Sequence, residues 1–211
     1  MSLSAGTRTL DYGWLLDRIL ATVEERAYLI PVTSAPVGSR EALRRIAEAL
    51  AAPDFEPEAV RTFIDDLAHE QQLDPVMRLS ALCVVATHPS VANWALAARL
   101  AGEQEVVALQ HGGADLSAWL ASVDRHRGVI AWSLGQPAVA LDHFSRALER
   151  QHNPENLGNV LCALVALGEH EHAADLFSRV SQCHPAGFVA ELRLRVAQDP
   201  DLALLRDEEP S

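Results

Sequence analysis

The chain has 211 residues, of which 49% are hydrophobic, and this is enough apolar side chain for a packed core. Its 17 basic residues are all arginine and face 29 acidic residues, which gives a formal net charge of −12. This charge disfavours binding to nucleic acid or to an anionic membrane, and the absence of lysine excludes Schiff-base chemistry and a phosphate-loop lysine. Three widely separated cysteines and an N-terminus without a secretory signal pattern predict a cytoplasmic protein, and no apolar run reaches the roughly 18 residues of a membrane helix.

Helix-forming residues dominate the chain from its first segment onwards. Aromatic residues make up only 5% of the sequence and β-branched runs are nearly absent, so local propensity predicts an all-α fold. Between Asp11 and Leu29 the apolar residues recur at the three-to-four spacing of one buried helix face. The prolines and glycine of residues 31–38 predict a flexible loop, after which Ser39 caps the next helix. Residues 1–87 are thus predicted to form N-terminal helical hairpins.

From residue 53 onwards, prolines open the predicted helices and glycines end them. Asp74 supplies a helix cap directly before Pro75, whereas Gly102 and the pair Gly112-Gly113 act as helix stops. About eleven helices with short loops result, which is the pattern of stacked antiparallel hairpins. In this part of the chain the predicted helices span 57 to about 72, 75 to about 87, 89–102, 103–111, 116–134, 137–151, 154–167, 170 to about 183 and 186–198, and 202–206 form a capping segment.

A 33-residue spacing separates three of the predicted helix stops, Gly102, Gly135 and Gly168. After the second and third of these glycines, small and aromatic residues recur with the same shift, which predicts repeated helical hairpins. The matching pairs are Ala140 and Ala173, Phe144 and Phe177, and Ala147 and Val180.

Residues 121–185 resemble the tetratricopeptide repeat, whose second helix carries Ala-x-x-x-Phe and whose unit often closes with proline. The segments from Ala140 to Phe144 and from Ala173 to Phe177, and the closing Pro185, carry this resemblance. It implies a right-handed α-solenoid with a concave groove that binds a protein segment. We therefore predict tetratricopeptide-like units at 88–120, 121–153 and 154–187, the first with a shortened second helix. C-terminal capping helices would complete the repeat region of residues 88–211. Together with the N-terminal hairpins, this region would form one continuous domain.

The sequence offers no catalytic, cofactor-binding or metal-binding signature. It contains no glycine-rich phosphate loop and no Gly-x-Ser-x-Gly motif. His170 and His172 flank Glu171, but this spacing places the two imidazoles on different sides of a helix, whereas a helical metal pair is three or four residues apart. We therefore predict a non-enzymatic protein with no cofactor and no bound metal.

The 33-residue period also predicts a binding surface. When it is projected onto the first helix of each unit, Asn93, His126 and Asn159 fall at equivalent positions, on the side that lines the groove in the resembled family. Side chains that both donate and accept hydrogen bonds suit an extended peptide backbone. Two arginines would add contacts to a carboxylate and a tryptophan would add an apolar platform. The predicted binding residues are Asn93, Arg125, His126, Trp132, Asn159 and Arg193.

These observations favour a scaffold or adaptor that binds a neutral to basic protein or peptide, with a cytosolic secretion chaperone as a narrower version. The alternative is a structural subunit that buries apolar surface, such as the hairpin with Tyr12, Trp14 and Tyr28, in a homo-oligomer or larger assembly. A third class, a hydrolase or metalloenzyme, would need a site assembled from distant helices.

Overall fold

The computed structural model describes residues 37–52, 54–111 and 113–206, and every regular element in these ranges is a helix. The predicted all-α class is therefore confirmed for this part of the chain, whereas the predicted helix from Asp11 to Leu29 lies outside it. None of the described helices is both long enough and apolar enough to cross a membrane. The α-helices and the 3-10 helices (η) are, in chain order, α2 (Val37–Leu50), α3 (Pro57–His69), α4 (Pro75–Thr87), α5 (Trp94–His111), η1 (Gly113–Asp115), α6 (Leu116–Ser133), α7 (Pro137–Arg150), α8 (Pro154–Ala166), α9 (His170–Cys183), α10 (Ala186–Gln198) and η2 (Pro200–Leu205).

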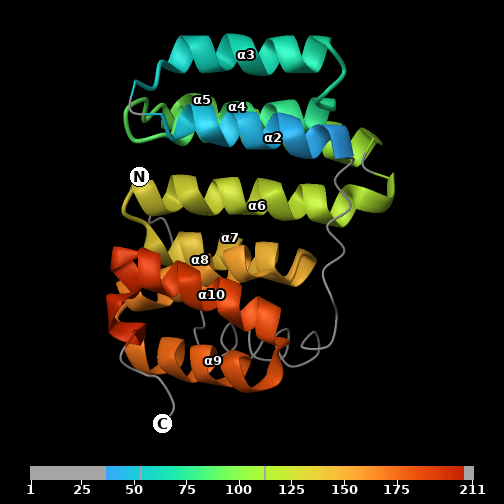
Figure 1. The fold of residues 1–211 in the computed structure, drawn as a ribbon. Coiled ribbons are helices and arrows are strands. Elements are labelled where there is room, and N and C mark those ends of the chain that lie inside the picture. The colour runs from blue at the N-terminus through green and yellow to red at the C-terminus, as the bar shows by residue number, and fades with distance from the viewer. Residues whose placement is uncertain (1–36, 53, 112, 207–211) are drawn as a thin grey trace, which may run out of the picture.

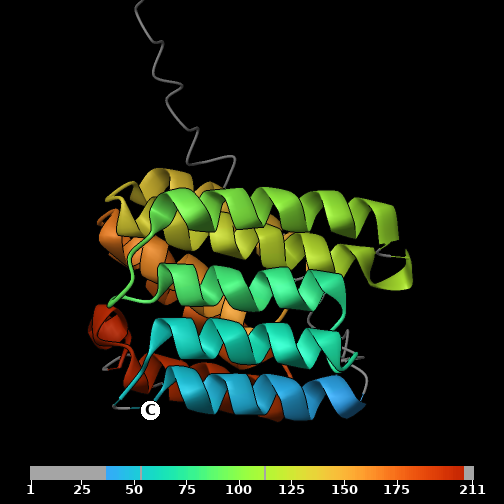
Figure 2. The same ribbon diagram turned by 90° about the horizontal axis from the view of Figure 1, so that it is seen from above.

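The α-helices lie side by side in a stack, with α2 and α3 towards one end and α9 and α10 towards the other (Figures 1 and 2). Each helix from α2 to α8 packs against the next one in the chain, as short loops require of neighbouring helices. Further contacts skip one helix and join α4 to α6 and α8 to α10. Each hairpin is thereby held by the hairpin that follows it.

Two helix starts are set by local sequence. Asp74 Oδ1 accepts a hydrogen bond from the backbone N–H of Met77 at 2.9 Å, and Asn153 Oδ1 accepts one from Asn156 at 2.8 Å. In α4 and α8 alike, a proline follows the cap at the first helical position, where its missing N–H leaves no bond unmade. The predicted cap at Asp74 is confirmed.

Helix α5 is longer than the sequence predicted. The predicted stop at Gly102 is wrong, because α5 continues through it as one helix of 18 residues. A glycine inside a helix costs only about 1 kcal/mol, and the buried apolar side chains before and after Gly102 outweigh this cost. The helix also begins later than Pro89, because Asn93 Oδ1 accepts a hydrogen bond from the N–H of Leu96 at 3.0 Å and caps it.

Two further predictions need correction. Helix α2 begins at Val37, so Ser39 lies inside the helix and not before it, and residues 37 and 38 of the predicted loop are helical. Residues 88–120 are not a hairpin with a shortened second helix, because a turn, the single helix α5, η1 and the start of α6 occupy them. Helices α5 and α6 have 18 residues each, so the two together are longer than one 33-residue unit. The 33-residue period therefore does not extend to this part of the chain.

The 33-residue spacing does hold between the last two hairpins. Helices α7 and α9 each have 14 residues and begin at residues 137 and 170, which are 33 positions apart. Before each helix stands a glycine in the left-handed region, Gly135 at φ 69° and Gly168 at φ 82°, which glycine adopts without steric cost. Phe144 and Phe177 are 3% and 8% exposed. Both rings are therefore buried at corresponding positions of α7 and α9.

The buried apolar side chains form two clusters that meet in α6. The N-terminal cluster joins residues of α2 to α5 and includes Ile130 of α6, whereas the C-terminal cluster includes the adjacent Ala131 and extends to η2. Leu202 and Leu205 of η2 are buried, and η2 packs against α8, α9 and α10. The predicted capping segment therefore shields the end of the second cluster.

Helices α6 and α7 approach each other closely where Gly128 faces the ring of Phe144. A Cβ atom added at Gly128 would lie 2.3 Å from Phe144 Cε1, far inside van der Waals contact. The absence of a side chain at Gly128 is what lets this ring enter the core.

We therefore expect Gly128→Ala to destabilise the protein by about 1–3 kcal/mol, because the buried ring must move. The matched control is Gly102→Ala in α5, where an added Cβ would meet no neighbouring group within 4 Å. This control should gain about 0.5–1 kcal/mol, since alanine is the better helix former. Urea unfolding of both variants measures the difference, and equal effects of the two changes would contradict the close approach.

Candidate functional site

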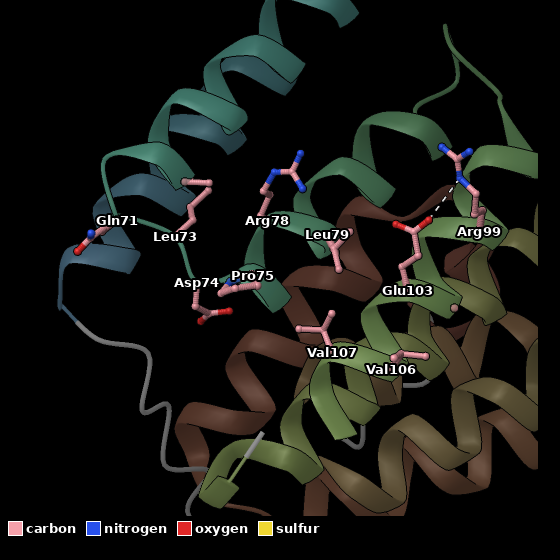
Figure 3. Close-up of a pocket in the computed structure, with 12 residues that line it drawn as sticks. Gln71, Leu73, Asp74, Pro75, Arg78, Leu79, Arg99, Glu103, Val106 and Val107 are labelled. Atoms are coloured by element: carbon pink, nitrogen blue, oxygen red, sulfur yellow. Dashed lines mark ion pairs between the residues drawn. The ribbon is translucent and has the colours of Figure 1, made fainter. Parts of the chain in front are cut away.

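A groove of about 1230 Å³ lies along α4, between the corner that joins α3 to α4 and the side of α5 (Figure 3). The aliphatic side chains of Leu73 and Leu79 line it from the α4 side, and Val106 and Val107 line it from α5. Val106 is 53% exposed, and the charged side chains of Arg78, Arg99 and Glu103 line the same groove beside the aliphatic ones. Small-molecule pockets usually occupy about 300–1,000 Å³, so this groove is large enough for a protein segment.

The rim of the groove carries ion pairs. Arg99 Nε lies 3.5 Å from Glu103 Oε1 on α5, and Arg78 Nη2 lies 2.7 Å from Asp65 Oδ1 on α3. All four side chains are at least 40% exposed, and exposed pairs of this kind contribute only about 0–1 kcal/mol. The rim charges can therefore exchange partners at little cost.

A second, smaller hollow of about 250 Å³ continues the groove along α5 towards Asn93. It shares Arg78, Leu79, Arg99 and Glu103 with the larger one. Asn93 is the predicted binding residue that lines this surface, and its side-chain oxygen is already used to cap α5.

The predicted row of Asn93, His126 and Asn159 is not one exposed surface. Asn93 precedes the second helix of its hairpin and is exposed, whereas His126 lies inside α6 and is only 4% exposed. Asn159 is half-buried in α8. The prediction is wrong in its geometry because α5 does not end at Gly102, so the 33-residue shift does not relate Asn93 to the other two residues.

The other predicted binding residues lie on α6 and α10. Arg125 donates to Glu155 Oε2 at 3.0 Å and so links α6 to α8. Trp132 is half-buried and packs against the C-terminal cluster, whereas Arg193 is exposed on α10. None of these three residues lines the groove along α4.

His126 belongs to a buried polar network that joins three helices. Its Nε2 atom lies 2.9 Å from Ser80 Oγ of α4 and 3.4 Å from Ser122 Oγ of α6. Gln104 of α5 donates from Nε2 to Ser122 Oγ at 3.2 Å. These bonds pair most polar groups of the network, as burial usually requires, whereas Gln104 Oε1 is buried without a hydrogen-bond partner.

The contact between Ser80 and His126 has the distance expected of a nucleophile and its base. Burial, together with the charge of Arg125, lowers the pKa of His126 to about 3. An imidazole with this pKa is a weak base near neutral pH, and neither residue lines the groove along α4. The pair is thus best explained as an interhelical hydrogen bond.

Asp124 is a buried carboxylate that binds α6 to α7. Its Oδ2 accepts a hydrogen bond from Arg150 Nε at 2.9 Å, and His143 Nδ1 lies 3.6 Å from its Oδ1. Burial alone would raise the pKa of Asp124, but His143, Arg146 and Arg150 hold it below its usual value. Asp124 is therefore ionised near neutral pH and pairs with cationic groups of α7.

Two buried histidines meet between the hairpins at the C-terminal end. His152 Nε2 and His184 Nε2 are 2.7 Å apart, and the ring of Phe188 stacks on His152 with centroids 5.2 Å apart. Burial lowers the pKa of His184, which favours the neutral ring. Within the described residues, no group of three or more His, Cys, Asp or Glu side chains is placed to hold a metal ion.

The residues that line the groove, above all Val106 and Val107, were not predicted from the sequence. Within α5 the buried residues Ala97, Leu100 and Ala108 follow one helical face, and Val106 lies off that face. This second apolar face could have been found in the sequence if α5 had been treated as one helix. The predicted stop at Gly102 divided it.

Lowering the pH from about 7 to about 5 should reduce the free energy of unfolding. The pKa of His126 is about 3 in the folded protein and 6.5 in an ordinary imidazole, so the unfolded chain binds the proton first. The contribution of this neutral histidine is complete above pH 6.5 and is lost as the pH falls towards 3, by at most about 1.4 kcal/mol per pH unit. Urea unfolding should show a shallower pH dependence for His126→Gln than for the wild type, and identical slopes would count against the burial of a neutral imidazole.

Comparisons with known proteins leave the geometry as the basis for any functional assignment. No family model, no curated protein and no solved structure matches this chain. The similarity of residues 121–185 to the tetratricopeptide repeat therefore stays a prediction from the motif.

Proposed function

We propose that this protein is a non-enzymatic scaffold or adaptor that holds a segment of another protein in the groove along α4. Its helical hairpins would stack as a right-handed α-solenoid of the tetratricopeptide type, with the N-terminal hairpins continuing the same array. The observation that carries the proposal is the groove itself, which has aliphatic walls on α4 and α5 and an exposed Val106.

The placement of this surface differs from the concave groove that the sequence predicted. Helices α3 and α5 wall the groove along α4. When α4 is paired with α5 in the way that α6 pairs with α7, both walls are second helices of their hairpins, whereas the predicted groove lay on the first helices. Asn93 remains at its edge, while His126 and Arg125 serve helix packing instead. The net charge of −12 still favours a neutral to basic partner.

A structural subunit of a homo-oligomer is the second candidate function. Leu109, Leu134 and Leu204 are each more than half exposed, and such side chains are suited to burial against another chain. Light scattering on the purified protein separates the two candidates, because the adaptor proposal expects a monomer and the subunit proposal expects a stable dimer or larger species.

The adaptor proposal predicts that Val106→Asp abolishes partner binding without unfolding the protein. Val106 is 53% exposed, so a carboxylate there remains solvated, but it opposes an apolar partner in the groove. Leu194→Asp on α10 is the matched control, since Leu194 is 55% exposed and lies away from the groove. The measurement is quantitative mass spectrometry of proteins retained by the wild type and by each variant.

Proteins that the wild type and Leu194→Asp both retain should be recovered in at least about tenfold smaller amounts with Val106→Asp. A tenfold loss of affinity corresponds to about 1.4 kcal/mol of binding free energy. An identical set of retained proteins in all three samples would refute binding in this groove. Circular dichroism of the variants controls for unfolding.

A further inference from the structure

Along most of its length, the groove along α4 offers an occupant no free backbone groups. Residues of α4 and α5 line this stretch, and the peptide groups inside an α-helix bond to one another, whereas Gln71, Leu73 and Asp74 at one end belong to the loop between α3 and α4. The lining combines aliphatic side chains with those of Gln71, Arg78, Arg99 and Glu103, and Asp74 and Asn93 already accept hydrogen bonds as helix caps. An extended peptide would therefore leave most of its N–H and C=O groups without a backbone partner in this groove.

An occupant with internally satisfied backbone groups avoids this cost, and an α-helix meets that condition. Helix-in-groove recognition needs one apolar stripe on the incoming helix and an apolar base in the groove. The side chains of Leu73, Leu79 and Val106 supply such a base. The chemistry of the walls thus favours a helix over the extended peptide that the sequence predicted.

The length of the groove sets the length of the occupant. The residues that line the larger and the smaller hollow along α5 run from its cap, Asn93, to Val107. At 1.5 Å per helical residue this stretch is about 20 Å long, which matches a partner helix of about four turns.

The charges along the rim set the polarity of the occupant. Arg61 Nη1 lies 3.4 Å from Glu58 Oε2, and Arg78 and Arg99 are paired with Asp65 and Glu103, so every arginine of the rim faces a carboxylate. A rim neutralised in this way repels neither sign, while the net charge of −12 attracts a basic segment from a distance. The complementary helix has an apolar face and basic flanks.

We propose that the groove binds an amphipathic α-helix of about four turns, with basic flanking residues, from a partner protein. This inference rests on the proposed adaptor function and specifies the conformation and charge of the segment that is held. A second copy of this chain and its own residues 1–36 are the competing occupants.

The test places the photoreactive residue p-benzoylphenylalanine at Val106 of the full-length chain, with the same residue at Leu194 as control. The segment cross-linked at position 106 is identified by mass spectrometry and synthesised as a labelled peptide, and its affinity for the unmodified full chain is measured by fluorescence anisotropy. Two variants of the peptide carry either proline or alanine at the same central position of its polar face.

Proline in a helix interior costs about 3 kcal/mol, so the proline peptide should bind at least about 100-fold more weakly than the alanine peptide. Binding of the alanine peptide should also weaken as salt rises, because its basic flanks face a negatively charged chain. Equal affinities of the two peptides would overturn the helical occupant while leaving the adaptor function intact.

The identity of the cross-linked segment separates the remaining outcomes. A cross-link to a second copy or to residues 1–36 would overturn the partner helix and assign the groove to the chain itself. If position 106 gives no more cross-linked product than the control position 194, both this inference and the adaptor function are overturned.

Discussion

Helix α6 has neighbours on opposite sides, and the packing of the remaining helices depends on how its side chains meet that constraint. Ile130 faces the N-terminal apolar cluster and Ala131 faces the C-terminal one, so consecutive residues serve two cores. Gly128 admits the ring of Phe144 from α7, while His126 is bonded to Ser80 of α4. Because buried polar groups are costly when unpaired, the positions of these partners fix how α4 and α7 sit on α6.

The groove along α4 is a consequence of the same packing. Helix α5 uses Ala97, Ala101 and Ala108 against its neighbours, and these small side chains leave Val106 on the face that is turned away. Helices α3 and α5 lie on either side of α4 (Figure 2), so part of the α4 surface stays uncovered between them. The proposed binding surface is thus defined by the spaces between helices, and this shape is the reason for proposing a helix as its occupant.

Polar side chains of α6 are occupied in helix packing. Arg125 reaches Glu155 of α8, and Asp124 is held by Arg150 of α7. A long polar side chain on a helix covered by others has to find a partner inside the protein, because the helices around it exclude water. Polar residues in the first helices of these hairpins therefore join helices together, and the exposed apolar residues of α5 are the better candidates for recognition.

The sequence by itself determined the features that depend on a few neighbouring residues. The cap at Asp74, the left-handed glycines at 135 and 168 and the small and aromatic residues of α7 and α9 act within one turn or one hairpin, so their spacing is visible in the chain. Only the tertiary structure decided that α5 continues through Gly102, that His126 is buried and that Val106 faces a groove. The physical reason is that a helical pattern tells which residues share a face, whereas the neighbour that covers each face is chosen by the packing of helices distant in the sequence.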